Sequence, residues 1–326
     1  MLLMGSRDRR LRRRCHDLCP CFGCRLDGVR LFRASVLHHL KRSPVLAIVL
    51  CCMCPAAYTQ STSVQWRPKR IVNGSPMIIT VRPAVRLQSL SGKWLDHDVF
   101  FSYAPKQKLW IGFAGAGLKT TPGRYILQLT GDTTHDTRFA IERKIAVAKA
   151  KYRSIAVSVP EQFTKPSEEQ LREIAGAKAI KQDVLSRVTP ERQWSGAFDA
   201  PVNAAVSDVF GTARTFNGET QGVHEGLDFG VPSGTPVHAI NGGTVILARP
   251  LFFEGNFVVV DHGQGLLSMY MHLSKFEAKE GDQVEKGQEL GLSGGSGRAT
   301  GPHLHIAVRW QGIYLDPAIL LKLRVP

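Results

Sequence analysis

The sequence predicts a mostly β protein, with an N-terminal β-sandwich, a connector helix and a C-terminal antiparallel β domain. Three observations predict this arrangement. Short apolar runs separated by Gly and Pro recur through residues 66–160. A helical period of apolar residues appears over 164–187. From 194 to 326 glycine becomes frequent, and strand-like runs alternate with turns. A chain of 326 residues has room for about two globular domains.

The segment 1–57 precedes these elements and is predicted to be a doubtful N-terminal extension followed by a signal peptide. Residues 38–58 combine a basic flank, an apolar run of about ten residues and small residues, the order of a secretory signal. Cleavage is expected near Ala56 or Ala57. The apolar run is short for a membrane span, so an uncleaved N-terminal anchor with membrane association is the alternative. A lipoprotein is less favoured because Cys51 follows Leu50. We expect export to the periplasm or cell envelope.

The segment before this signal is Arg-rich and shows no apolar periodicity over residues 1–33. The true start is therefore expected near Val29, Val36 or Leu37, which would make the leading residues a gene-model artefact. All seven cysteines lie within the first 54 residues, so the folded part contains neither disulfides nor thiol chemistry. A metal site at 15–24 is disfavoured because no flanking element would order it.

The net charge of +15 is unevenly distributed along the chain. Residues 1–57 hold 11 Lys and Arg against 3 Asp and Glu, and the remaining chain holds 31 against 24. The moderate surplus in the folded part suits an acidic polymer such as a cell wall, and equally a merely soluble basic surface. Nucleic-acid binding has no support beyond the basic N-terminus.

The region 66–160 is predicted to be a β-sandwich-like module. Tyr125, Leu127 and Leu129 alternate with the residues between them at the period of a strand, just after a ThrProGly turn at 121–123. Similar runs occur at Met77–Val81, Val99–Tyr103, Leu109–Phe113 and Ile155–Val159. The region carries no clustered His, Asp or Cys, so we interpret it as a binding or spacing module.

The region 161–193 is predicted to be a helical connector. Ser167 and Gln170 have the spacing of a capping box. The apolar positions expected to face a domain follow at helical spacing: Leu171, Ile174, Ala175 and Ala179. Whether the segment 160–205 inhibits the site described next stays open.

Three segments of the region 194–326 carry the residue types of a metal site. His224 and Asp228 stand four residues apart, His272 ends an apolar run, and His303 and His305 stand at i and i+2. On a strand, the last two side chains point to the same face. Two imidazoles on one face with a His/Asp pair are the ingredients of an open zinc site. Each segment alone is a weak signal, but their order and the Gly-rich spacing strengthen it.

With these motifs, residues 207–317 resemble the lysostaphin-type (LytM) zinc metallopeptidases, the peptidoglycan endopeptidase family. The matching text is PheGly at 210–211, HisGluGlyLeuAsp at 224–228, GlyThrProVal at 234–237, AspHisGly at 261–263, TyrMetHisLeu at 270–273, GlyAspGlnValGluLysGlyGln at 281–288, SerGlyGlySerGly at 293–297, GlyProHisLeuHis at 301–305 and AspPro at 316–317. The region from Tyr103 to Tyr125 is similar to the immunoglobulin-like modules that precede such domains in some bacterial proteins, which implies an immunoglobulin-like sandwich for the module at 66–160.

The resemblance implies a role for five residues. His224, Asp228 and His305 match the Zn²⁺ ligands, His303 matches the His that assists the attacking water, and His272 matches the His that stabilises the oxyanion. Which of His272 and His303 is the general base stays open. All five positions carry the family's residue. Some relatives have lost ligands and activate amidases instead.

The remaining candidates receive structural interpretations. His262 follows a strand in a turn, and His238 lies within a strand. SerGlyGlySerGly at 293–297 lacks the Lys and the following helix of a P-loop. The resemblance thus implies a zinc endopeptidase that hydrolyses stem or cross-link peptides of peptidoglycan. The alternative is a non-catalytic, wall-binding activator of other peptidoglycan hydrolases. The bond cleaved and the oligomeric state stay open.

Overall fold

The computed structural model describes residues 61–218 and 220–326. The described chain is mostly β with predominantly antiparallel pairing, which confirms the predicted fold class. The predictions for the signal peptide and the leading segment lie outside the described residues. Among the described helices, none is long and apolar enough to cross a membrane.

The N-terminal module is a sheet of eight strands in the order β1-β3-β6-β5-β4-β7-β8-β2. The strands are β1 (Ser63–Arg67), β2 (Ile71–Val72), β3 (Pro76–Arg82), β4 (Ser91–Trp94), β5 (His97–Ala104), β6 (Leu109–Gly115), β7 (Gly123–Asp132) and β8 (Arg138–Ala148). They contain the runs that the sequence predicted between 77 and 130.

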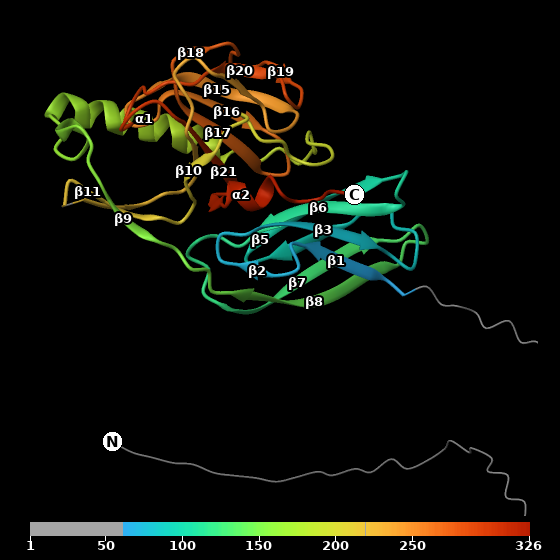
Figure 1. The fold of residues 1–326 in the computed structure, drawn as a ribbon. Coiled ribbons are helices and arrows are strands. Elements are labelled where there is room, and N and C mark those ends of the chain that lie inside the picture. The colour runs from blue at the N-terminus through green and yellow to red at the C-terminus, as the bar shows by residue number, and fades with distance from the viewer. Residues whose placement is uncertain (1–60, 219) are drawn as a thin grey trace, which may run out of the picture. The chain divides into compact units, whose positions relative to one another are not determined.

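The sheet folds over itself because β5 belongs to both halves (Figure 1). Phe100 on β5 pairs with Ser91 on β4, whereas the next residue, Phe101, pairs with Gly112 on β6. The fully buried Trp94 donates its indole N–H to the carbonyl of Gly115 at 2.9 Å, which ties β4 to β6. These contacts join the two layers of a sandwich.

Strand β9 (Ser154–Val157) pairs outside this module (Figure 1). It lies parallel to β11 (Ala213–Phe216), which pairs antiparallel with β12 (Thr220–Val223). The predicted run at 155–159 is therefore a strand, but its partner comes from the C-terminal region. This three-stranded sheet lies next to the residues of the candidate site.

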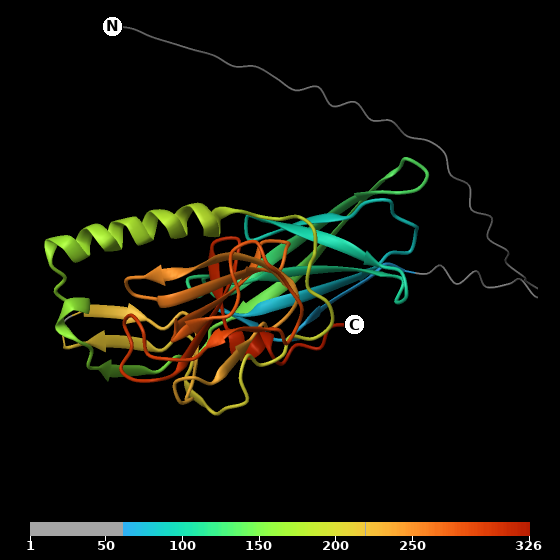
Figure 2. The ribbon, with the colours of Figure 1, turned by 90° about the horizontal axis from the view of Figure 1, so that it is seen from above.

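The connector consists of a short 3-10 helix, η1 (Glu161–Phe163), and helix α1 (Glu168–Ser186). The capping box is confirmed: the Ser167 hydroxyl accepts from the Gln170 backbone N–H, and the Gln170 side chain accepts from the Ser167 backbone N–H. At the other end, the Arg309 guanidinium donates to the carbonyl of Leu185 at 2.7 Å. The helix lies alongside the C-terminal domain near β15 (Figure 2).

The predicted apolar face of α1 is wrong. Leu171 is 46% exposed, and Ala175 and Ala179 are also exposed. The helix instead buries Ala177, Val184 and Leu185. These residues pack with Leu247, Leu251, Phe257, Val259, Leu267, Met269 and Ala307 of the C-terminal domain. Two apolar series of helical spacing coexist in this sequence, and packing against the sheet selects the one that lies further along the helix.

The C-terminal domain is built on the sheet β10-β13-β21-β17-β16-β15-β19, with β22 paired to β21, and on a small sheet β14-β20-β18. The strands are β10 (Val206–Asp208), β13 (Leu227–Phe229), β14 (Pro236–His238), β15 (Gly243–Leu251), β16 (Gly255–Asp261), β17 (Leu266–Leu273), β18 (Lys275–Phe276), β19 (Gln283–Val284), β20 (Glu289–Leu292), β21 (Leu304–Trp310) and β22 (Ile313–Leu315); helix α2 (Pro317–Leu320) follows. Strands β16, β17 and β21 are buried almost throughout.

The sandwich module and the C-terminal domain share side-chain contacts. Trp310 packs against His97 and Phe113, with ring centroids 5.0 Å and 6.4 Å away. A Cβ on Gly115 would lie 2.6 Å from Leu315, so this close approach requires glycine. The buried apolar residues of both regions accordingly form one continuous core.

Candidate metal centre

The sheet register brings two of the predicted metal ligands together. Strand β13 pairs antiparallel with β21, and Asp228 lies directly opposite His305. Neighbouring β17 pairs with the other edge of β21, with Met271 opposite His305. His224 precedes β13 and continues the pairing of β12 with β11, because its backbone N–H donates to the Thr212 carbonyl and its own carbonyl accepts from the Gly211 N–H.

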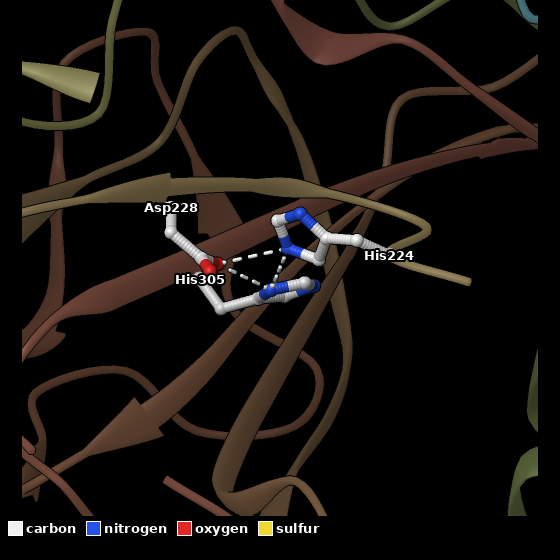
Figure 3. Close-up of side chains that lie close together, drawn as sticks. All are labelled: His224, Asp228 and His305. Atoms are coloured by element: carbon white, nitrogen blue, oxygen red, sulfur yellow. Dashed lines mark hydrogen bonds and ion pairs between the residues drawn. The ribbon is translucent and has the colours of Figure 1, made fainter. Parts of the chain in front are cut away.

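The side chains of His224, Asp228 and His305 point toward one another (Figure 3). Asp228 Oδ1 lies 3.0 Å from His224 Nε2 and 2.7 Å from His305 Nδ1. The two ring nitrogens lie 3.0 Å apart. His224 and Asp228 are buried, and His305 is partly exposed. One ligand atom from each residue thus converges on one point, as a metal site requires.

The hydrogen bonding around this group matches a bound cation. His224 Nδ1 lies 2.9 Å from the carbonyl oxygen of Val209. Because a carbonyl only accepts, Nδ1 must carry the proton, and the neutral ring therefore presents a lone pair at Nε2. That lone pair meets a carboxylate oxygen and a second ring nitrogen, both within 3.0 Å. These three atoms form a donor set that fits a cation. Imidazole nitrogen and carboxylate oxygen are ligands that Zn²⁺ accepts.

The carboxylate of Asp228 is held from its other side. Its Oδ2 accepts from Arg214 Nη2 at 2.8 Å, which leaves Oδ1 for the imidazoles. Arg214 also binds Asp208, a buried carboxylate that Arg153 binds as well. Burial would raise the pKa of Asp228, but the contacts with the imidazoles of His224 and His305 outweigh this effect and hold the pKa well below its ordinary value. Asp228 is therefore an anion at neutral pH.

His272 and His303 form the opposite side of the group. Their ring centroids lie 4.8 Å apart, and His272 lies 6.0 Å from the His305 ring. His272 Nδ1 donates to the carbonyl of Ser296, and His303 Nδ1 donates to that of Gly301, each at 2.8 Å. In its neutral form, each ring therefore has its lone pair at Nε2. His303 Nε2 lies 4.0 Å from Asp228 Oδ1.

His272 stands in an unusual environment. Its φ of 63° is in the left-handed region, where a non-glycine residue is uncommon and where strain often accompanies function. Burial, followed by the proximity of His305 and His303, lowers the pKa of His272 to about 3. Its imidazole is therefore neutral at neutral pH.

The region that holds the site matches a known family. A family model described as Peptidase family M23 matches residues 222–317. A solved structure described as a peptidase M23 from Pseudomonas aeruginosa is 30% identical, covers 77% of this chain and 95% of its own, and has a TM-score of 0.59.

The chain belongs to peptidase family M23.

Curated relatives match a part of the chain. The peptidoglycan DD-endopeptidase ShyA of Vibrio cholerae is 43% identical over 103 residues, which are 32% of this chain and 23% of that protein. The DD-carboxypeptidase/endopeptidase Mpg of Neisseria meningitidis serogroup B is 36% identical over 127 residues, 38% and 29% of the two chains. The match thus spans less than a third of either relative. The predicted resemblance to the lysostaphin-type peptidases is confirmed at the level of the family.

The five predicted residues of the M23 region line one cleft of about 720 Å³. The walls include residues that the family match does not reach, among them Arg153, Asp208 and Arg214. Our sequence analysis missed these three, because scattered Arg and Asp residues outside a motif carry no signal. It also missed the carbonyls of Ser296 and Gly301, although both stand inside motifs that it quoted.

The two other candidate histidines lie outside this cleft. His262 is fully buried, donates from Nδ1 to the carbonyl of Gly242 at 2.7 Å, and lies 2.8 Å from the hydroxyl of Ser268. His238 Nδ1 lies 3.3 Å from the carbonyl of Pro201. Both environments are those of structural residues, as the sequence analysis expected.

Proposed function

We propose that this M23 protein is a zinc-dependent endopeptidase that hydrolyses peptide bonds in peptidoglycan. The observation that carries the proposal is the convergence of His224, Asp228 and His305 beside two imidazoles with free Nε2 atoms. Relatives named as peptidoglycan endopeptidases support the substrate class. Action on peptidoglycan implies a location in the cell envelope.

His224 Nε2, Asp228 Oδ1 and His305 Nδ1 would hold the zinc ion. Two nitrogens and one oxygen form the three-ligand set of a catalytic zinc site, which leaves a coordination position for water or substrate. Bound there, zinc would supply a Lewis acid that lowers the pKa of water and polarises a carbonyl group. Arg214 would keep Asp228 Oδ2 away from the ion, so that Asp228 contributes one oxygen.

His303 would move the proton. The neutral rings of His303 and His272 each accept at Nε2, because a backbone carbonyl holds the proton on Nδ1. Neither ring can donate to an oxyanion before it has accepted a proton. We assign the acceptance to His303, whose Nε2 faces the ligand carboxylate and whose ring is more exposed than that of His272. The protonated ring then donates to the leaving amine.

His272 would accept a hydrogen bond from the attacking water at its Nε2 and hold that water from the other side. Its burial and its low pKa keep the ring neutral, so it does not hold the proton that the water releases. The left-handed backbone at this residue and the bond to Ser296 fix the ring in place.

The second candidate function is a non-catalytic activator of other peptidoglycan hydrolases. The complete set of five residues disfavours it. The experiment that separates the two functions incubates the purified protein with muropeptides, with and without a chelator, and identifies the products by mass. We expect chelator-sensitive cleavage that returns when zinc is added. Inactivity of a fully zinc-loaded protein on every muropeptide would instead favour the activator.

A further inference from the structure

Arg298 occupies a distinctive place in the wall of the cleft. It lies on the loop between β20 and β21, two residues after Ser296 and three before Gly301. The carbonyls of those two residues orient His272 and His303. The backbone N–H of Arg298 donates to the carbonyl of Phe253 at 2.9 Å. This bond anchors the loop to the turn between β15 and β16.

The guanidinium of Arg298 is held by two aromatic rings. Its Cζ lies 4.8 Å from the ring centroid of Phe216 and 4.7 Å from that of Phe253. Both phenylalanines line the same cleft. A guanidinium is attracted to the face of an aromatic ring, and its five N–H donors lie in its own plane. The two rings therefore hold the cation in place at the wall of the cleft.

Arg298 also differs from the other cations of the cleft. Four Arg and Lys side chains line it within the described residues: Arg153, Lys181, Arg214 and Arg298. Arg153 and Arg214 bind Asp208, and Lys181 binds Glu254. In the described part of the chain, no residue accepts a hydrogen bond from the Arg298 guanidinium or forms an ion pair with it.

Glu254 is the carboxylate whose charge acts on Arg298, and it already forms an ion pair with another residue. Its Oε1 is paired with Lys181 from helix α1. Its Oε2 is buried and has no hydrogen-bond partner. The competing interpretation is therefore that Arg298 only balances the charge of Glu254 and packs the wall.

We propose that Arg298 binds a carboxylate of the substrate peptide and selects peptides in which that carboxylate is free. A guanidinium binds a carboxylate through two parallel hydrogen bonds, which add geometric specificity to the attraction. The proposal rests on the peptidase function proposed above. Peptidoglycan peptides offer two such groups, the free carboxylate of a diamino acid and the carboxylate of a terminal alanine.

The test compares zinc-loaded wild type with Arg298→Lys and Arg298→Met. The substrates are muropeptides in which the diamino-acid carboxylate or the terminal carboxylate is either free or amidated. For one of the two carboxylates, we expect wild type to prefer the free acid in kcat/KM on the order of 10- to 100-fold, the range of a hydrogen bond to a charged group. Arg298→Met should lose this preference, because its kcat/KM falls further on the free acid than on the amide. Arg298→Lys should retain part of the preference, because it keeps the charge and loses the planar fork.

The control is Arg192→Met. The Arg192 guanidinium lies 4.9 Å from the ring centroid of Trp194, and Arg192 does not line the cleft. This variant removes a comparable aromatic contact and should keep the preference of wild type. An equal loss by Arg298→Met on acid and amide substrates would overturn the proposal and identify Arg298 as a packing residue. An unchanged preference would overturn it as well.

A binding measurement separates this inference from the proposed function. Zinc-loaded His303→Ala should bind the preferred free acid more tightly than its amide by calorimetry, and the further change Arg298→Met should abolish the difference. This result would support the role of Arg298 even if wild type hydrolysed none of the muropeptides, in which case the proposed function alone would fail. Equal binding of acid and amide by His303→Ala would overturn the inference.

Discussion

Asp228 on β13 and His305 on β21 face each other as a cross-strand pair, with Asp228 Oδ1 2.7 Å from His305 Nδ1. The geometry of the ligand group is therefore tied to the register of the sheet. A slip of one residue would turn one of the two side chains to the opposite face. The buried strands on both sides of β21 specify that register, so the same apolar packing that stabilises the sheet also positions the metal ligands.

Gly226→Ala should weaken zinc binding. A Cβ at this position would lie 2.5 Å from His305 Cε1 and 2.5 Å from the carbonyl oxygen of Ile306, so the His305 ring must shift. We expect a loss of about 10- to 100-fold in zinc affinity, the range found when the support of a metal ligand is disturbed. Titration against a competing chelator measures it. Gly230→Ala is the control, because its nearest neighbour is Ser207 Cβ at an ordinary 3.8 Å. Wild-type affinity in Gly226→Ala would refute the prediction.

Arg214→Met should lower the stability of the metal-free protein by about 3 kcal/mol. Arg214 is 20% exposed and serves two carboxylates, and removing one partner of a buried ion pair leaves an uncompensated charge. Arg153→Met is the matched control. Arg153 binds the same Asp208, but its side chain is 51% exposed, so we expect a loss below about 1 kcal/mol. Urea unfolding at neutral pH measures both, and similar losses would count against the difference in burial as the cause.

His262 should make the protein sensitive to acid. Burial lowers its pKa to about 4 from the ordinary 6.5, while the bond to Gly242 opposes the shift. Between these two values the unfolded chain binds a proton that the folded chain does not, so stability falls as the pH falls from about 6.5 to about 4. The full difference corresponds to about 3 kcal/mol.

His262→Gln tests this contribution, because glutamine does not titrate. Urea unfolding at pH 7 and pH 4 should show a smaller loss on acidification in the variant than in wild type, by about 3 kcal/mol. The comparison removes the shared effects of other groups, including His272. Equal losses in the two proteins would show that His262 does not contribute.

The sequence predicted much of the fold because its signals are local. The alternation around Leu127 marks β7, and the spacing of Ser167 and Gln170 marks the start of α1. The buried face of α1 was not predictable in this way, because Ala175 and Ala177 both belong to apolar series of helical spacing. Only contact with the sheet selects between them. The pairing of β9 with β11 is equally non-local.

The candidate site, like the fold, was predictable only where its signals are local in sequence. The motifs supplied His224, Asp228, His272, His303 and His305, and the structure brings them into one cleft; their chemical roles stay predictions. Arg214 and Asp208 were missed, because what they do depends on a contact between residues of different strands. Arg298 was not predicted either, because its contacts are with the rings of Phe216 and Phe253, which are distant in sequence.

The central claim is that His224, Asp228 and His305 bind zinc while His303 transfers the proton. The most direct test is the zinc content of purified His303→Ala and His305→Ala beside wild type, with muropeptide hydrolysis measured on the same samples. We expect about one zinc ion per chain in wild type and in His303→Ala, and loss of zinc in His305→Ala. Hydrolysis should fall by about 100- to 10,000-fold in His303→Ala. If His303→Ala released zinc as readily as His305→Ala, the assignment of ligands would be contradicted.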